Sequence, residues 1–179
     1  MSSVFHRIHN YLIGDQINKG RFASIRVCFK KNCDKPLCAK LINKASLAKY
    51  HETHNIIFNE RYLAPLIIHP NVVEVIDVFD SQRTIFQITQ LYQNGSLLNV
   101  LQHGYETKDP SKKYELLDFD QKLRITCDIL SAIHYLHTHF ICHRDIKLEN
   151  VIVTDTLQAK LCDFGLAVVT FDGNVKGKC

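Results

Sequence analysis

The pattern of hydrophobic and polar positions predicts strands in the first half of the chain. Residues 11–27 have the pattern of a strand, a tight turn and a second strand. Residues 72–78 and 84–89 form two further apolar stretches, which the polar turn Asp80-Ser81-Gln82-Arg83 separates. This half of the chain is therefore predicted to be rich in β-structure.

Helical periodicity appears in two places. Residues 50–64 show it in a broken form, and a long amphipathic helix is predicted to begin at Asp118. Asp118 and Gln121 have the spacing of a capping box, which marks the first turn of a helix. The apolar face of the long helix comprises Leu123, Cys127, Leu130 and His134, flanked by Ile129, Ile133 and Leu136.

The composition is that of an ordinary globular protein. The 179 residues are 46% hydrophobic and 22% charged, which is enough for a domain with a hydrophobic core. The formal net charge of +4 is not concentrated in one run, so neither nucleic-acid binding nor membrane binding is implied. No apolar segment approaches the roughly 18 residues of a membrane span, and the charged N-terminal residues lack the core of a signal peptide.

The seven cysteines do not have the spacing of a zinc site. Cys28, Cys33 and Cys38 are five residues apart rather than two to four, and no paired Cys or His accompanies them. We interpret them as small buried or half-buried residues of strands, with a metal or disulfide role as the alternative. Free thiols indicate a reducing compartment, the cytoplasm or else the nucleus.

The most informative stretch is His143-Arg144-Asp145-Ile146-Lys147-Leu148-Glu149-Asn150. It is followed by the β-branched run 151–153 and then by Asp163-Phe164-Gly165. Its His, Arg, Asp, Lys and Asn at fixed offsets occur by chance in about one chain in ten thousand, at ~1/20 per position. The stretch resembles the catalytic loop of the protein kinases, and Asp163-Phe164-Gly165 resembles their metal-binding motif.

The resemblance implies a role for each polar residue. Asp145 would accept the proton of a substrate hydroxyl, and Asn150 and Asp163 would supply oxygen ligands to Mg²⁺. Lys147 would reach the transferred phosphate, and a Lys at this position marks serine/threonine specificity in the family. The alternative is that Asp145 and Asp163 are solvated loop carboxylates.

A glycine-rich phosphate loop is expected between the first two strands, where the family has G-x-G-x-x-G-x-V. This chain has Asn18-Lys19-Gly20-Arg21-Phe22-Ala23-Ser24-Ile25, so only the middle glycine is present. Asn tolerates a left-handed backbone best among the other residues, and Ala adds one methyl group. The loop residues expected to contact ATP are therefore Asn18, Gly20, Phe22, Ala23 and Ile25, and an ordinary hairpin is the alternative.

Lys40, at the end of Leu37-Cys38-Ala39-Lys40, matches the lysine that holds the α and β phosphates in the family. Glu60 is its expected partner, on the helix predicted within residues 50–64. Pro65 disfavours helix at Ala64, so this helix should end or kink one turn past Glu60. The alternatives are a surface lysine and a solvated helix carboxylate.

The remaining expected contacts belong to the nucleoside. The resemblance places the hinge at Leu91 and Tyr92, whose backbone groups would bind adenine, with Thr89 as gatekeeper. Ser96 would lie near the ribose. Cys38 and Ile25 would cover adenine from above and Ile152 from below.

The expected fold is the α+β, two-lobed protein kinase fold. Residues 1–10 would be an N-terminal extension, residues 11–93 a complete lobe with the hinge, and residues 94–179 part of a helical lobe. The complete lobe is expected to have a five-stranded antiparallel sheet and one helix. The sequence stops inside the activation segment, so the chain is expected to be a fragment that is inactive alone.

The expected function is ATP-dependent phosphorylation of Ser or Thr in proteins, with Mg²⁺ as cofactor. The alternative is a catalytically dead remnant that binds nucleotide and acts through a partner. Arg144 implies activation by a phosphorylated residue, for which Thr170 lies early. Phe22-Ala23, Lys147-Leu148 and Phe171-Asp172-Gly173 resemble polo-like kinases, and the general pattern also suits the calcium/calmodulin-dependent group.

Overall fold

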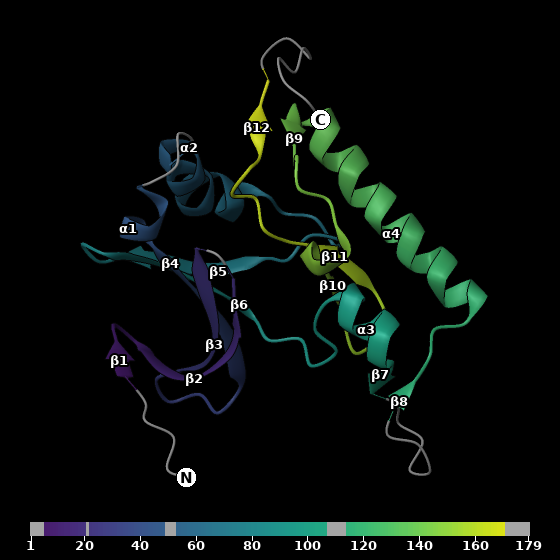
Figure 1. Cartoon of the computed structure of the whole chain (residues 1–179), viewed down its shortest axis with the longest axis horizontal. Helices are drawn as coiled ribbons and strands as arrows, with labels where there is room; N and C mark the ends of the chain where they lie inside the picture. The colour runs from purple at the N-terminus through teal and green to yellow at the C-terminus, as the bar shows by residue number, and fades with distance from the viewer. Residues whose placement is uncertain (1–5, 21, 49–52, 107–113, 171–179) are drawn as a thin grey trace. The chain divides into compact units, whose positions relative to one another are not determined.

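The computed structural model describes residues 6–20, 22–48, 53–106 and 114–170 (Figure 1). The chain divides into two compact units. The first contains the residues up to Leu66 together with Glu74–Leu91, and the second contains Ile67–Val73 together with the residues from Tyr92 onward. A sheet with short helices forms the first unit, and a long helix with short strand pairs forms the second, which confirms the α+β class.

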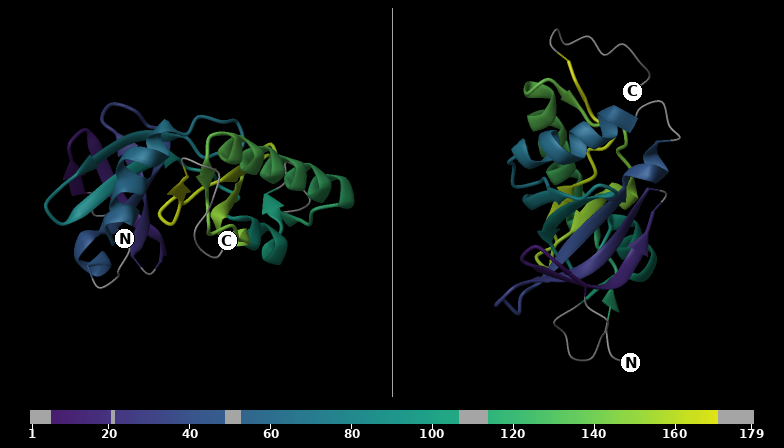
Figure 2. Two further views of the ribbon diagram at one scale, coloured as in Figure 1. Left: turned by 90° about the horizontal axis from the view of Figure 1, so that it is seen from above. Right: turned by 90° about the vertical axis from the view of Figure 1, so that its left-hand side faces the viewer.

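An antiparallel sheet of six strands organises the first unit. The strands are β1 (His6–Ile8), β2 (Tyr11–Lys19), β3 (Ala23–Lys30), β4 (Pro36–Asn43), β5 (Val75–Asp80) and β6 (Thr84–Gln90). Their order is β1-β2-β3-β4-β6-β5. Figure 2 shows that this sheet is strongly curled. The order brings β4 between β3 and β6, so Lys40 lies in the middle of the sheet.

The sheet has one strand more than the five predicted. β1 comes from the residues assigned to an N-terminal extension, and it pairs with the start of β2 through a tight turn. His9 in that turn has a φ of 51°, a left-handed value that lets the chain reverse direction. Ile8 packs against the hydrophobic core, and this contact gives the short edge strand a reason to form.

Alternating strand residues build two hydrophobic clusters in this unit. One consists of Tyr11, Ile13, Cys28, Leu37, Ala39 and Ile88, and the other of Ile42, Leu47, Ile56 and Ile85. The hydroxyl of buried Tyr11 donates to Asp77 Oδ2 at 3.0 Å. Burial and this hydrogen bond raise the pKa of Tyr11 to about 12.

The helical segment of the first unit is irregular. α1 (Lys44–Leu47) is capped by the Asn43 side chain, and α2 (Thr53–Phe58) continues as a π-helical turn, η1 (Asn59–Leu63), and a 3₁₀ turn, η2 (Ala64–Leu66). Regular α-helix stops at Phe58, and the π-helical turn changes to the 3₁₀ turn at Ala64, one turn past Glu60, where an end or kink was predicted. The wider turn accommodates Pro65, which has no N–H to donate. Residues 50–52 of the predicted helix lie outside the described part of the chain.

The second unit consists of short elements around one long helix. These elements are α3 (Leu97–His103), β7 (Tyr105–Glu106), β8 (Tyr114–Glu115), α4 (Phe119–Thr138), β9 (Ile141–Cys142), η3 (Leu148–Asn150), β10 (Val151–Val153), β11 (Ala159–Leu161) and β12 (Val168–Val169). The strands pair as β7 with β8, β9 with β12, and β10 with β11. α4 runs alongside β9 and β11 (Figures 1 and 2).

The predicted capping box starts α4. The Gln121 N–H donates to Asp118 Oδ1 at 2.7 Å, and the Asp118 N–H donates to Gln121 Oε1 at 2.8 Å. The face of α4 that packs inside the unit carries Ile125, Ala132 and Leu136. The predicted apolar stripe of Leu123, Cys127, Leu130 and His134 is exposed.

Two strand-related predictions need correction. The strand predicted at 72–78 begins at Val75, because Val72 and Val73 instead pair with Leu161 in the second unit. Cys28 is buried in β3 and Cys38 is half-buried in β4, as predicted, but Cys33 is exposed in the connection between these strands.

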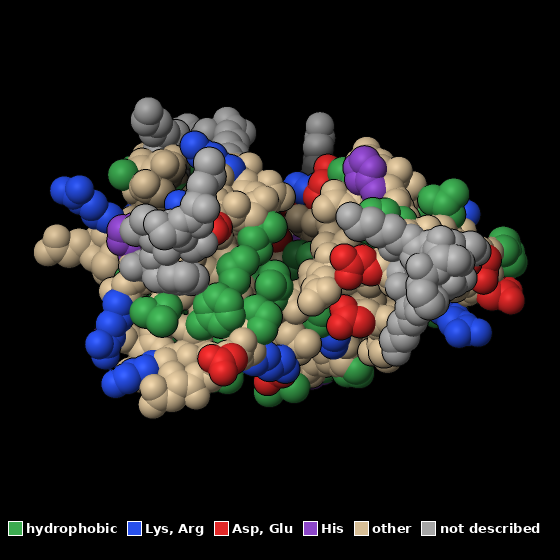
Figure 3. Space-filling model, turned by 90° about the horizontal axis from the view of Figure 1, so that it is seen from below, with side chains coloured by type: hydrophobic (Ala, Val, Ile, Leu, Met, Phe, Trp, Pro, Cys, Tyr) green, Lys and Arg blue, Asp and Glu red, His purple; other side chains and the backbone are tan. Residues whose placement is uncertain are grey.

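Figure 3 shows a hydrophobic patch on the first unit, with Lys, Arg, Asp and Glu side chains beside it. Leu12 and Ile17 of β2 are among the exposed hydrophobic residues of this unit. Among the described helices, none has both the length and the hydropathy needed to cross a membrane.

Candidate active site

The loop after β9 places Asp145 through hydrogen bonds of buried His143. The Asp145 N–H donates to His143 Nδ1 at 3.2 Å, so Nε2 carries the ring proton and donates to the Cys162 carbonyl at 3.0 Å. The rings of His143 and Phe164 lie 4.9 Å apart. The histidine therefore ties the loop to the segment that carries Asp163.

The carboxylate of Asp145 has two neighbours from its own loop. Asn150 Nδ2 donates to Asp145 Oδ2 at 2.8 Å and to the Asp145 carbonyl at 2.8 Å. Lys147 Nζ donates to the same Oδ2 at 2.7 Å. The structure thus brings three of the predicted site residues into direct contact.

Asp163 lies beside this group. The Cys162 N–H donates to the Asn150 carbonyl at 2.9 Å, which joins the two loops next to Asp163. Asp163 has a φ of 67°, and the Gly165 N–H approaches its Oδ1 at 3.4 Å. The hydrogen bond to Asp145, with the charges of Asp145 and Asp163, raises the pKa of Lys147. Lys147 is therefore within the electric field of both carboxylates.

Arg144 and Thr170 have structural contacts of their own. Arg144 has a φ of 63°, and its Nε donates to the Leu166 carbonyl at 2.7 Å. Thr170 is buried, and its N–H donates to the Phe140 carbonyl at 2.8 Å where β12 pairs with β9. In this conformation its hydroxyl is not presented to a modifying enzyme.

Lys40 and Glu60, both in the first unit, form the predicted ion pair. Lys40 Nζ lies 2.5 Å from Glu60 Oε1, and the Glu60 side chain is only 2% exposed. Sequence reasoning missed Gln87, whose Nε2 donates to Glu60 Oε2 at 3.0 Å. The available signal was a Gln within the run Ile85–Ile88 of β6, where its neighbours Phe86 and Ile88 are apolar.

The β2–β3 turn is an ordinary tight connection. The Gly20 N–H donates to the Ala23 carbonyl at 2.8 Å, and Asn18 pairs with Ile25. None of the described residues from 18 to 25 has a positive φ, so Asn18 does not adopt the left-handed geometry that Asn tolerates. Phe22 and Ala23 pack against the cluster around Ile42.

Strand register places the predicted adenine and phosphate contacts of the first unit on one face of the sheet. Ile25 lies opposite Lys40, and Cys38, two residues before Lys40, lies opposite Thr89. Directly opposed residues share a face, as do residues two apart on a strand. Burial raises the pKa of the Cys38 thiol, so this thiol stays protonated at neutral pH.

The remaining predicted contacts are divided between the two units. Leu91 ends the first unit and Tyr92 begins the second, where the Tyr92 carbonyl accepts the Gly95 N–H at 3.2 Å. Within the second unit, Ser96 and Ile152 form an isolated antiparallel bridge. The Ser96 hydroxyl caps α3 by accepting the Asn99 N–H at 3.3 Å.

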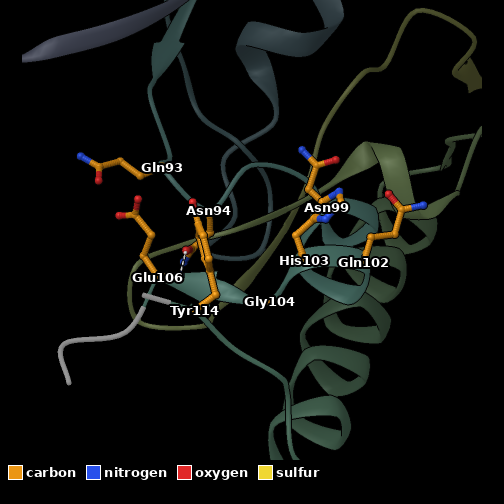
Figure 4. A pocket seen from close by; sticks show the side chains of 8 residues that line it. All are labelled: Gln93, Asn94, Asn99, Gln102, His103, Gly104, Glu106 and Tyr114. Carbon is orange, nitrogen blue, oxygen red and sulfur yellow. Dashed lines mark hydrogen bonds between the residues drawn. The ribbon is translucent and has the colours of Figure 1, made fainter. Parts of the chain in front are cut away.

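A polar hollow of about 800 Å³ lies elsewhere in the second unit, and it contains none of the predicted site residues. Figure 4 shows its side chains: Gln93, Asn94, Asn99, Gln102, His103, Glu106 and Tyr114, with Gly104. The Glu106 N–H donates to Asn94 Oδ1 at 3.0 Å. The hollow has no contact that connects it to Asp145 or Asp163 among the described hydrogen bonds.

Comparison with known proteins gives one consistent family. The family model "Protein kinase domain" matches residues 11–176. The chain is 31% identical over 173 residues to a carbon catabolite-derepressing protein kinase of Saccharomyces cerevisiae, covering 96% of this chain and 25% of that protein. It is 30% identical over 168 residues to CBL-interacting protein kinase 31 of Oryza sativa subsp. japonica, covering 93% of this chain and 35% of that protein.

The name of a third relative states which residues that protein phosphorylates. The chain is 30% identical over 167 residues to "Probable serine/threonine-protein kinase CCRP1" of Zea mays, covering 93% of this chain and 25% of that protein. The chain therefore spans between a quarter and about a third of the length of these relatives.

Proposed function

The chain belongs to the protein kinase domain family, and on that premise we propose that it is part of a kinase that phosphorylates Ser or Thr in proteins. The contact between Asp145 and Asn150 carries this proposal, because it holds a carboxylate and an amide side by side in one loop. Relatives named as protein kinases, one of them as serine/threonine-specific, support the reaction class.

Asp145 is the group we assign to the acceptor hydroxyl. Its carboxylate would accept the hydroxyl proton as the oxygen attacks phosphorus, and the two contacts at Oδ2 would keep it oriented. Lys147, with a raised pKa, stays charged and is suited to neutralise negative charge on the transferred group.

The donor set of the second unit fits a magnesium ion. The Asn150 nitrogen donates to Asp145, so its side-chain oxygen is the atom to bind the ion, together with the carboxylate of Asp163. Mg²⁺ prefers such oxygen ligands. Bound Mg-ATP would supply the phosphoryl group and the positive charge that offsets its oxygens.

In the first unit, we assign Lys40 to the α and β phosphates of ATP and Glu60 to the positioning of Lys40. The shared sheet face supports contacts of Ile25, Cys38 and Thr89 with the nucleotide. Asn18, Gly20, Phe22 and Ala23 would cover the phosphates, Leu91 and Tyr92 would bind adenine, and Ser96 and Ile152 would complete the nucleoside contacts.

We assign residues 11–93 to the ATP-binding lobe with the hinge and residues from 94 to the second lobe, and we place the protein in the cytoplasm or nucleus. We also propose that the protein belongs to a polo-like or calcium/calmodulin-dependent-like subgroup. One motif behind this assignment, Phe171-Asp172-Gly173, lies outside the described residues.

A second candidate function is nucleotide binding without catalysis. It is favoured by the β2–β3 turn, where Ala23 stands at a family glycine and packs against a hydrophobic cluster. A turn held in this way closes less readily on phosphates.

One experiment separates the two functions. A purified kinase domain that contains this chain is titrated with Mg-ATP by calorimetry, and transfer of labelled phosphate to a generic Ser/Thr protein substrate is measured in parallel. The kinase proposal is supported if Asp163→Ala abolishes binding of Mg-ATP and Asp145→Asn abolishes phosphate transfer. Binding without transfer favours the second candidate, and absence of both contradicts the proposal for this chain.

A further inference from the structure

Gln87 is a polar residue in a buried position of the central sheet. It is 7% exposed and stands in β6 between buried Phe86 and Ile88. Burying an amide is unfavourable unless it forms hydrogen bonds. Its Nε2 has two acceptors on one residue, Glu60 Oε2 at 3.0 Å and the Glu60 backbone carbonyl at 3.2 Å.

The sheet register adds a second donor to the same residue. Lys40 on β4 lies directly opposite Gln87 on β6, so both side chains project from the same face. Lys40 Nζ binds Glu60 Oε1 at 2.5 Å while Gln87 binds Oε2. Each carboxylate oxygen of Glu60 therefore has a donor from one of two facing strand positions.

The irregular helix explains why the Glu60 carbonyl accepts a side-chain donor. In regular α-helix the N–H of Ala64 would donate to it, but in η1 the Ala64 N–H donates to the Asn59 carbonyl. Continuing the π pattern would require the N–H of residue 65, and Pro65 has none. Gln87 Nε2 donates to the Glu60 carbonyl in place of the backbone N–H that either helix pattern would provide.

The residue after Glu60 is also tied to the sheet. Arg61 Nη1 lies 2.7 Å from Asp80 Oδ2, and Lys44 Nζ lies 2.7 Å from the same oxygen. Asp80 ends β5, the neighbour of β6. Two successive residues of η1 are thus anchored to two adjacent strands.

We propose that Gln87 is a positioning residue, which holds Glu60 against Lys40 from within the sheet. Lys40 then keeps its carboxylate partner through contacts inside the first unit. The consequence for catalysis rests on the proposed function of Lys40, but the positioning itself is a property of the unit and is testable without ATP.

The test compares Gln87→Met with Gln16→Met in the 179-residue chain. Met preserves the length of Gln87 and removes both donors, and Gln16 is an exposed position on β2 that serves as the matched control. The rate of Lys40 acetylation by an N-hydroxysuccinimide ester is measured by mass spectrometry against exposed Lys122, and amide hydrogen exchange is followed at residues 59–64. Gln87→Met should accelerate exchange about tenfold to a hundredfold, as loss of hydrogen bonds to a charged group implies.

Two further arms distinguish positioning from general stability. Lys40 reactivity in Gln87→Met should approach that of Glu60→Gln, and adding Pro65→Ala should recover part of the exchange protection by restoring a backbone donor. In the unmodified chain, the side-chain amide protons of Gln87 should exchange more slowly than those of Gln16.

These measurements of Lys40 reactivity and hydrogen exchange can fail or succeed independently of the test of the proposed function. Unchanged Lys40 reactivity and exchange in folded Gln87→Met, or a Gln87 amide that exchanges as fast as that of Gln16, would overturn the inference. A chain that binds no Mg-ATP but shows both predicted effects would contradict the proposed function and support the positioning role.

Discussion

Asn150 donates its side-chain amide to Asp145 twice, once to the carboxylate and once to the backbone carbonyl, both at 2.8 Å. The two residues therefore fix each other: Asp145 gains an oriented carboxylate, and Asn150 gains a fixed direction for its oxygen. Five positions of sequence separate them, and the 3₁₀ turn η3 brings them together. Under the proposed function, one contact would thus prepare a proton acceptor and a metal ligand at once.

Asp145→Asn should lower the phosphorylation rate about 10²–10⁴-fold, the usual effect of losing a positioned acid or base. Affinity for Mg-ATP should stay nearly unchanged, because an Asn oxygen can still accept the Asn150 amide and preserve the loop. Initial rates and calorimetric titration measure the two quantities in a kinase domain that contains this chain.

Glu149→Gln is the matched control, since it removes one negative charge from an exposed neighbour in the same loop. Its rate should equal that of the unmodified protein. A normal rate in Asp145→Asn would instead show that Asp145 does not have the assigned role.

Asn18→Gly combined with Ala23→Gly should tighten Mg-ATP binding, because backbone amides of the turn could approach phosphate oxygens more closely. The double variant should also lose a little stability, since Ala23 packs against the cluster around Ile42. Calorimetry gives the affinity and urea unfolding gives the stability. If affinity is unchanged, the absent glycines do not limit the closing of the turn.

The residues that we propose for catalysis could be found in the sequence because their signals are local. Asp145, Lys147 and Asn150 lie within six residues of chain, and their identities and spacing carry the chemistry. The pair of Lys40 and Glu60 was predicted from order along the chain, and the structure places the two side chains in contact.

The features that escaped prediction depend on register and on backbone irregularity. Gln87 reaches Glu60 only because β6 pairs with β4 in one register and because η1 widens before Pro65. Val72 resembles the residues of β5, yet it pairs with Leu161, which is distant in sequence. Periodicity carries no information on such nonlocal pairing.

Tyr11 should make the stability of the chain fall in alkali. Its pKa is raised from 10.0 to about 12, so its protonated form stabilises the fold fully below pH 10. That contribution, on the order of 3 kcal/mol, is lost progressively as the pH rises from 10 through 12. Urea unfolding at pH 8 to 11.5 should show a steeper decline for the unmodified chain than for Tyr11→Phe.

Tyr62→Phe, at a half-exposed tyrosine, is the control and should follow the unmodified chain. Equal slopes for Tyr11→Phe and the unmodified chain would mean that Tyr11 is neither buried nor hydrogen-bonded to Asp77 in solution.

Substitutions on the two faces of α4 should affect different properties: self-association for the exposed face and stability for the buried face. Leu123 and Leu130 are 54% and 59% exposed, whereas Ile125 is 3% exposed. Leu123→Ser with Leu130→Ser should reduce self-association of the chain, because exposed apolar stripes favour association. Their effect on the free energy of unfolding should stay within about 0.5 kcal/mol per site.

Ile125→Ala is the contrasting variant and should destabilise the chain by about 2–5 kcal/mol, since it leaves a cavity beneath the helix. Sedimentation velocity at several concentrations measures association, and urea unfolding measures stability. If the double serine variant loses several kcal/mol, the outer face of α4 is covered in solution, because substitution at a solvated face removes no buried contact. If the loss grows with protein concentration, a second copy of the chain supplies that cover.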